Sequence, residues 1–142
     1  PLAILRLPGV YGARDKGLGL IGKLMQCIRE GKEFTLLGNG LEQRNFLFSG
    51  DIPRAVEALS RTDFKELTIN LASGKSHSVA EIMEMLFKRY GDCPVRKVPQ
   101  TAPFCHLSFD PAIRKKAIDG FEMTSLGKGI SVYAPEKKEV TP

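Results

Sequence analysis

The chain has 142 residues, of which 42% are hydrophobic and 26% charged, and its formal net charge is +5. This length suits one domain with a modest core, and no apolar run approaches the ~20 residues that would span a bilayer. The basic residues are spread out without interleaved aromatic side chains, so we expect neither a nucleic-acid nor a membrane partner.

The first half of the sequence alternates strand and helix patterns. The apolar run 2–7 predicts a buried strand that Pro8 and Gly9 end; because it follows Pro1 with no lead-in, we expect the chain to begin within a fold. Apolar residues at three- and four-residue spacing predict an amphipathic helix from about residue 18 to Gly31. The extended runs 34–37 and 43–48 flank Gly38-Asn39-Gly40, which predicts a hairpin or a tight connection.

The second half continues this alternation. Asp51 is expected to cap a helix with Pro53 in its first turn. A short buried strand is expected over 67–72, and Ser78 with Glu81 fits a capping box ahead of a helix that ends at Gly91. The remaining predicted elements are an edge strand over 95–98, a short helix over 110–118 and a polar tail over 135–142. This order predicts a mixed α/β fold.

The glycines near the start of the first helix do not indicate a cofactor loop. A dinucleotide-binding fold requires glycines that directly follow a strand and open a helix, so that the amino end of the helix holds the pyrophosphate. Gly12, Gly17 and Gly19 lie close together, but the helix pattern begins only after Gly19. We therefore interpret these glycines as loop residues and expect no dinucleotide-binding loop in this chain.

Four strings carry a family resemblance. Residues 5–14 read LRLPGVYGAR, residues 31–51 read GKEFTLLGNGLEQRNFLFSGD, residues 70–81 read NLASGKSHSVAE, and residues 110–130 read DPAIRKKAIDGFEMTSLGKGI. In this order they resemble the LR..NVYGPR, G..l.l.G.G.Q.RDFVYVDD, NIGSG...S..E and D.SKA...LGF.P..SLEEGI patterns of the extended short-chain dehydrogenases. These are the NAD-dependent nucleotide-sugar epimerases and dehydratases.

The resemblance covers nearly the whole chain and implies an α/β fold. Residues 1–134 would form the C-terminal part of an extended Rossmann-type short-chain dehydrogenase, with its last parallel strands and a small mixed α/β substrate-binding subdomain. The glycine-rich loop and the catalytic Tyr-x-x-x-Lys would lie upstream. NAD or NADP would be bound mainly there, a homodimer would form through that part, and the partner here would be a nucleotide-sugar.

No catalytic or metal-binding residue is expected in the chain itself. Tyr133 and Lys137 have the Tyr-x-x-x-Lys spacing, but Ala134-Pro135 and a polar tail are the wrong context for a helix. His77 and His106 lack a second ligand at metal spacing. The three cysteines are odd in number and far apart, which indicates reduced thiols in a cytoplasmic protein.

The resemblance also implies binding residues. Pro8, Gly9 and Val10 match the loop that passes the nicotinamide, and Gly9 stands where the family usually has a substrate-contacting asparagine. Arg44 matches an arginine whose planar fork suits the substrate diphosphate.

The remaining matched positions line the nucleotide base and the second diphosphate clamp. Lys32, Phe34 and Leu36 belong to the stretch that lines the base through backbone groups. Gln100 replaces a second diphosphate arginine, which puts a standard nucleotide-diphosphate substrate in doubt.

Alternatives remain open at several of these positions. Arg44 is also consistent with a sheet-face arginine paired with Glu42 or Asp51, and Phe34 and Leu36 with plain core residues. At the level of function, a stand-alone module for phosphorylated ligands and an NAD(P)-dependent reductase of a non-nucleotide carbonyl substrate are the two alternatives.

Overall fold

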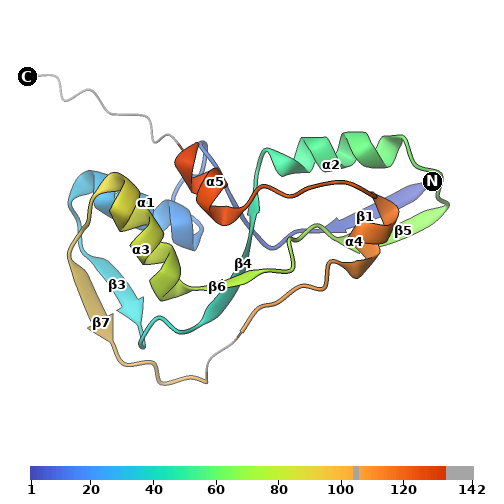
Figure 1. Cartoon of the computed structure of the whole chain (residues 1–142). Helices are drawn as coiled ribbons and strands as arrows, with labels where there is room; N and C mark the ends of the chain where they lie inside the picture. The colour runs from blue at the N-terminus through green and yellow to red at the C-terminus, as the bar shows by residue number, and fades with distance from the viewer. Residues whose placement is uncertain (104–105, 134–142) are drawn as a thin grey trace, which may run out of the picture.

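The computed structural model describes residues 1–103 and 106–133. Seven strands and five helices alternate along this part of the chain (Figure 1). In chain order they are β1 (Leu2–Arg6), β2 (Gly9–Tyr11), α1 (Leu20–Glu30), β3 (Phe34–Leu37), β4 (Gln43–Phe48), α2 (Asp51–Ser60), β5 (Glu66–Asn70), β6 (Ser76–Ser78), α3 (Val79–Tyr90), β7 (Val95–Val98), α4 (Ala112–Ala117) and α5 (Leu126–Ser131). None of these helices has the length and hydrophobicity to span a bilayer.

The strands pair across long sequence distances. β1 pairs with β5, β2 with β4 and β3 with β7, and all three pairs are parallel. β6 adds to β4 in the antiparallel sense, so that the central sheet has the order β2-β4-β6. Parallel pairs need crossover connections, which is why helices separate most of the strands.

Strand β4 stands between two hydrophobic cores. Its Leu47 packs in a core with Ala55 of α2 and Ile69 of β5. Phe46 and Phe48 pack on the other core, which α1, α3, α5 and β3 build. Side chains of a strand point alternately to its two faces, so β4 joins the β1/β5 end of the molecule to the helical end.

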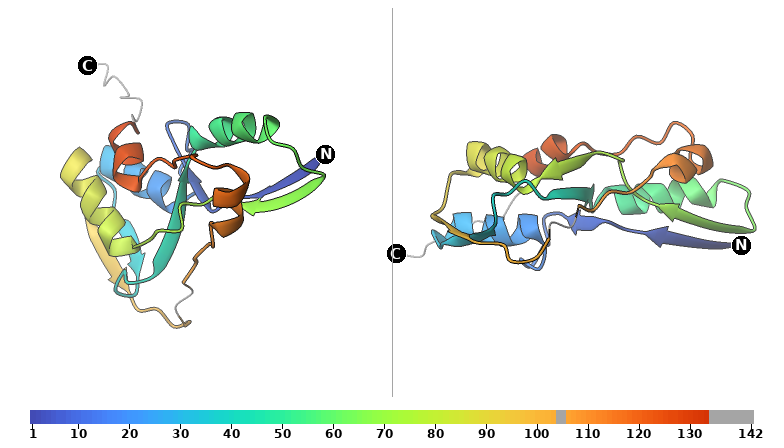
Figure 2. Two further views of the ribbon diagram at one scale, coloured as in Figure 1. Left: turned by 45° about the vertical axis from the view of Figure 1, so that its right-hand side comes forward. Right: turned by 90° about the horizontal axis from the view of Figure 1, so that it is seen from below.

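The two sides of the molecule carry different elements. In the right-hand view of Figure 2, α3, α4, α5 and β6 lie along one side, and β1, β2 and α1 lie along the other. β4 runs between the two sides. This arrangement places the end of β1 and the start of α1 on the same side.

Several local predictions are confirmed. Gly31 ends α1 in the left-handed conformation, at φ 61°. Ser78 and Glu81 form the complete capping box of α3: the Glu81 amide donates to Ser78 Oγ at 3.1 Å, and the Ser78 amide donates to Glu81 Oε2 at 3.0 Å. Residues 34–37, 43–48 and 95–98 are strands as predicted.

Of the two connections predicted between the runs 34–37 and 43–48, a hairpin or a tight connection, the hairpin is wrong. β3 and β4 belong to different sheets, because β3 pairs with β7 while β4 pairs with β2 and β6. Gly38 and Gly40 do adopt positive φ, at 69° and 77°. The prediction of a glycine turn is therefore correct, whereas the predicted pairing of the two strands is not. The sequence pattern did not predict three short elements, the strands β2 and β6 and the helix α5.

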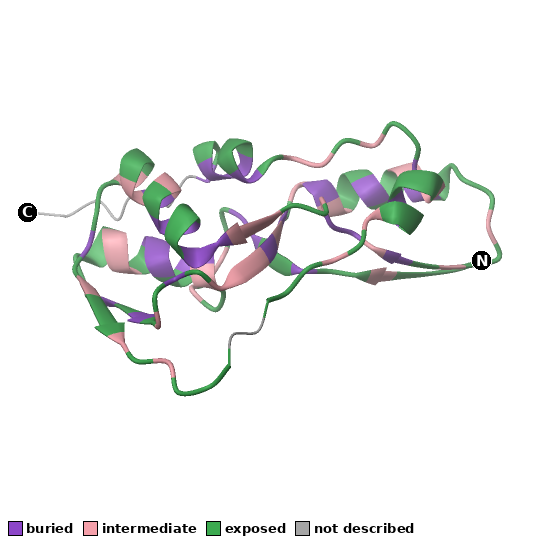
Figure 3. Ribbon diagram, turned by 60° about the horizontal axis from the view of Figure 1, so that its bottom comes forward, coloured by how far each residue is buried: buried purple, intermediate pink, exposed green. Residues whose placement is uncertain are grey.

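The first strand is present but is not buried. Leu2 is 57% and Ile4 49% exposed, and Figure 3 shows most of β1 as exposed. Only Leu5 of this strand packs on a core. In the described part of the chain β1 has one neighbour, so its other edge and one of its faces remain uncovered.

Asp51 does not cap α2 with its side chain. It is the first residue of the helix, and Gly50 takes the cap position without a side-chain bond. The Asp51 carboxylate is fully buried and accepts from the Thr124 amide at 2.8 Å, the Thr124 hydroxyl at 2.7 Å and Arg54 Nη1 at 2.7 Å. Asp51 therefore has a structural role, which is to hold the loop that contains Thr124.

Candidate functional site

Gly9 faces the ring of Phe46. The β2–β4 pairing sets Gly9 opposite Phe46, and a Cβ atom built on Gly9 would lie 3.3 Å from two atoms of that ring. A larger side chain at position 9 therefore requires the ring to move. Pro8 is buried, whereas Gly9 and Val10 are exposed. The contact between Gly9 and Phe46, the phenylalanine two positions after Arg44, was not predicted from the sequence.

Arg44 lies on the same strand and is half-buried. Its Nη2 is 2.7 Å from Glu42 Oε1, so the pairing with Glu42 that the sequence left open is present, while Asp51 pairs with Arg54 instead. The antiparallel register places Arg44 opposite His77 of β6. Because Phe46 and Arg44 are two residues apart, their side chains share one face of β4, and the sheet brings Arg44 near Gly9.

The residues predicted to line a nucleotide base differ in environment. Phe34 and Leu36 are buried in the helical core, so their side chains are core residues as the alternative held. The Phe34 amide donates to Pro94 O at 2.8 Å. Lys32 follows the end of α1, is 72% exposed and pairs with Glu30 at 2.8 Å, which raises the pKa of Lys32. Recognition through backbone groups of this stretch stays a prediction.

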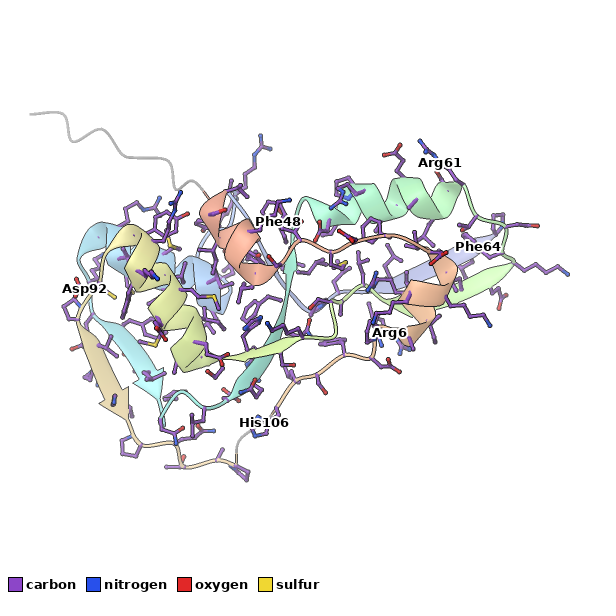
Figure 4. All side chains as sticks on the ribbon, in the orientation of Figure 1. Arg6, Phe48, Arg61, Phe64, Asp92 and His106 are labelled. Atoms are coloured by element: carbon purple, nitrogen blue, oxygen red, sulfur yellow. The ribbon has the colours of Figure 1, made fainter. Side chains whose placement is uncertain are left out.

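Gln100 lies in the exposed loop after β7. Its Nε2 donates to Pro103 O at 3.5 Å. This loop leads to a segment that runs beside β4: the Leu107 amide donates to Gln43 O at 3.0 Å, and the Gln43 amide donates to His106 Nδ1 at 3.2 Å. His106 lies near the start of β4 in Figure 4. Cys105 falls outside the described residues.

Three glycines have the spacing of a dinucleotide-binding motif. Gly17, Gly19 and Gly22 form G-x-G-x-x-G, a spacing that the interpretation of Gly12, Gly17 and Gly19 as loop residues overlooked. The surroundings of these glycines differ from those of a dinucleotide-binding loop. β2 ends at Tyr11, well before Gly17, and the strands on either side of α1 belong to different sheets.

A carboxylate already occupies the space beside these glycines. Asp15 Oδ1 accepts from the Gly17 amide at 3.0 Å. A Cβ atom on Gly22 would lie 2.3 to 2.4 Å from the Asp15 carboxyl group, so the two residues are in close contact. A negative side chain at the amino end of α1 disfavours a pyrophosphate at the same place.

The tyrosine of this region, Tyr11, is buried. Tyr11 packs against Phe46 and Phe48, and its hydroxyl donates to Leu126 O at 3.4 Å. Burial, with a smaller contribution from the charge of Asp51, raises the pKa of Tyr11 well above 10. The described residues also contain no group of three histidine, cysteine or acidic side chains that could hold a metal ion.

Comparison with known proteins identifies the family of this chain. Residues 1–72 match the model of the NAD dependent epimerase/dehydratase family. A Methanocaldococcus jannaschii protein named "Putative UDP-glucose 4-epimerase" is 30% identical over 92 residues, which are 63% of this chain and 30% of that protein. The fold and the family match together define an α/β chain with the extended short-chain dehydrogenase fold.

Solved structures agree with this fold. The UDP-glucose 4-epimerase of Thermotoga maritima superposes with a TM-score of 0.78 at 23% identity, over 92% of this chain and 44% of that chain. The UDP-glucuronic acid 4-epimerase of Bacillus cereus gives 0.79 at 24% identity, over 94% and 44%. The predicted fold class is therefore confirmed. This chain belongs to the NAD dependent epimerase/dehydratase family, and it spans less than half the length of these relatives.

Proposed function

We propose that this chain is the substrate-binding portion of an NAD(P)-dependent nucleotide-sugar epimerase or dehydratase. The observation that carries the proposal is the family match over residues 1–72, which includes the predicted diphosphate residue Arg44. The related structures from Thermotoga maritima and Bacillus cereus were solved with UDP-glucose and with UDP-glucuronic acid and NAD, respectively. The glycine-rich loop and the Tyr-x-x-x-Lys pair would then lie outside these 142 residues.

The exposure of strand β1 supports the proposal that the cofactor-binding part lies outside these residues. Its apolar residues Leu2 and Ile4 are about half exposed, and one of its edges has no partner in the described chain. An uncovered apolar strand edge is a liability in a domain that stands alone. Further parallel strands along this edge would bury it and would bring a dinucleotide to the carboxyl end of β1.

The fit of this chain to the cofactor is partial. Pro8, Gly9 and Val10 follow the carboxyl end of β1, where ligands of parallel α/β sheets bind. Exposed Gly9 and Val10 suit contact with the nicotinamide end, whereas the glycines before α1 do not suit the pyrophosphate because Asp15 fills their space. When bound, NAD supplies reversible acceptance of a hydride from the sugar.

The work of this chain's own residues is positioning. Arg44 would hold the diphosphate with charge-assisted hydrogen bonds, which are about twice as strong as neutral ones. Binding energy at this remote group would orient the sugar ring relative to the cofactor. In the proposed complex the diphosphate would take the place of the Glu42 carboxylate beside the Arg44 guanidinium.

A reductase acting on a non-nucleotide carbonyl compound is the second candidate. Two observations favour it: the Phe46 ring restricts the space next to Gly9, and Gln100 replaces a cationic diphosphate clamp. Such a protein would bind NAD(P) and reduce carbonyl compounds, but a nucleoside diphosphate would not compete with its substrate.

The experiment is to sequence the reading frame upstream of Pro1 and to measure ligand binding to its complete product. An upstream strand, glycine-rich turn and Tyr-x-x-x-Lys helix, together with micromolar to millimolar binding of UDP, are the expected results. An initiation codon immediately before Pro1 would contradict the enzyme proposal and favour a phosphate-binding module. Upstream motifs with no UDP binding would favour the reductase.

A further inference from the structure

A groove of about 590 Å³ lies where α3, α4 and the start of α5 approach β6. None of the predicted binding residues Pro8, Gly9, Val10, Lys32, Arg44 and Gln100 lines it. The elements that build it lie along the side of the molecule opposite β1 and α1, as the right-hand view of Figure 2 shows. Its volume falls within the ~300 to 1,000 Å³ of typical small-molecule pockets.

One wall of the groove contains a buried cation. Arg114 of α4 is 4% exposed, and its guanidinium donates to two backbone carbonyls, from Nε to Ala72 O at 3.2 Å and from Nη1 to Phe121 O at 3.0 Å. Within the described residues it forms no ion pair. The nearby carboxylate of Asp51 is engaged by Thr124 and Arg54.

Burial of the Arg114 guanidinium is costly. Desolvation lowers the pKa of Arg114, and the charge of Asp51 only partly opposes this shift. Natural proteins usually pair a buried cation with an anion, and the hydrogen-bonded carboxylate of Asp51 meets this requirement only in part. An anionic ligand would meet it without disturbing the two carbonyl bonds.

A second cation, Lys75, also lines the groove. Lys75 is exposed and follows Gly74, whose positive φ of 80° and close approach to Pro111 fix the turn. The Lys75 amide donates to Ser73 Oγ at 3.1 Å, which orders the same turn. His77 contributes a further nitrogen-bearing side chain. Glu122 is the one carboxylate of this lining, and it is exposed.

Apolar side chains line the groove beside the cations, together with the hydroxyl side chains of Ser73, Thr124 and Ser125. Phe46, Met85, Phe121 and Leu126 line it beside the cations. We propose that this groove binds a small molecule with a phosphate or carboxylate group on an apolar ring, the anion lying between Arg114 and Lys75 and the ring on the phenylalanines. The anionic group satisfies the buried guanidinium, and the ring displaces water from the apolar wall.

The test is calorimetric titration of the complete protein with phenyl phosphate, benzoate and, as the neutral analogue, benzyl alcohol. Binding of an anion that is at least about tenfold tighter than that of benzyl alcohol is expected, a difference that corresponds to about 1.4 kcal/mol. The comparison of phenyl phosphate with benzoate identifies which anion the groove prefers. Equal binding of the neutral compound, or no binding of either anion at ~10 mM, would overturn the proposal.

Variants locate the binding. Lys75→Ala should weaken anion binding at least about fivefold, and Glu122→Gln should strengthen it, because one removes an attraction and the other a repulsion. Lys65→Ala removes the same charge from the exposed start of β5 and should change nothing. Equal effects of the two lysine variants would show a nonspecific charge effect and would contradict the site. Competition experiments with UDP keep this outcome separate from the proposed substrate site.

Discussion

The buried carboxylate of Asp51 accepts two hydrogen bonds from Thr124, one from its amide at 2.8 Å and one from its hydroxyl at 2.7 Å. The two residues are 73 positions apart. This contact ties the loop before α5 to the first turn of α2 and so closes the chain around β4. A fully buried carboxylate satisfied in this way is a structural anchor.

Removal of this anchor should destabilise the protein. Asp51→Ala leaves the Thr124 amide without its acceptor and should lower the free energy of unfolding by about 2 to 3 kcal/mol. Thr124→Val removes only the hydroxyl bond and should lower it by about 1 kcal/mol. Urea unfolding followed by circular dichroism measures both. An unchanged unfolding midpoint for Asp51→Ala would show that the anchor contributes nothing.

Because Asp15 contacts Gly22, we expect Gly22→Ala to change the free energy of unfolding in opposite directions with and without the Asp15 side chain. Alanine usually stabilises a helix by about 1 kcal/mol relative to glycine. Here a Cβ atom at position 22 would overlap the Asp15 carboxyl group, so Gly22→Ala should instead destabilise the protein. In an Asp15→Ala background the same substitution should be stabilising. A double-mutant cycle of unfolding free energies measures the coupling, and additive effects would contradict the contact.

The role of Arg44 can be separated from that of its partner. Arg44→Ala in the complete protein should weaken UDP binding by about tenfold or more, because a charge-assisted contact is lost. Glu42→Gln removes the competing carboxylate and should leave UDP binding unchanged or tighter. Arg61→Ala, at the distant end of α2, is the matched control. Fluorescence or calorimetric titration gives the dissociation constants; a normal affinity for Arg44→Ala would remove this residue from the proposed site.

The buried phenol of Tyr11 predicts how stability depends on alkaline pH. Its pKa is raised in the folded protein, so the unfolded chain loses this proton first, from about pH 10 upward. The contribution of Tyr11 to stability is therefore complete below pH 10 and is lost as the pH rises further. Tyr11→Phe should unfold with a shallower dependence on pH above 10 than the parent protein. Parallel urea titrations at pH 8 and at higher pH check this, and identical slopes would contradict it.

The local elements were largely predictable because their signals are local. The spacing of apolar residues predicted α1, and Ser78 with Glu81 predicted the start of α3. The family strings also predicted the fold class, which the comparisons confirm. The order of these strings can be read from the sequence alone.

Pairing partners and burial were not predictable, because both depend on residues far away in the chain. β3 and β4 carry a hairpin-like turn, yet each finds a parallel partner elsewhere. Asp51 has the sequence context of a helix cap, but its carboxylate bonds Thr124. The spacing of Gly17, Gly19 and Gly22 fits a cofactor loop, and only the packing of Asp15 shows that the space is filled.

The sequence by itself thus determined every helix except α5, most of the strands, the family resemblance and the position of Arg44 on a strand. Tertiary structure decided that Phe34 and Leu36 are core residues, that Phe46 faces Gly9, and that Arg114 is a buried cation beside a groove. The physical reason is that propensity and capping act within a few residues, whereas burial and electrostatic pairing are set by neighbours that only the folded chain brings together.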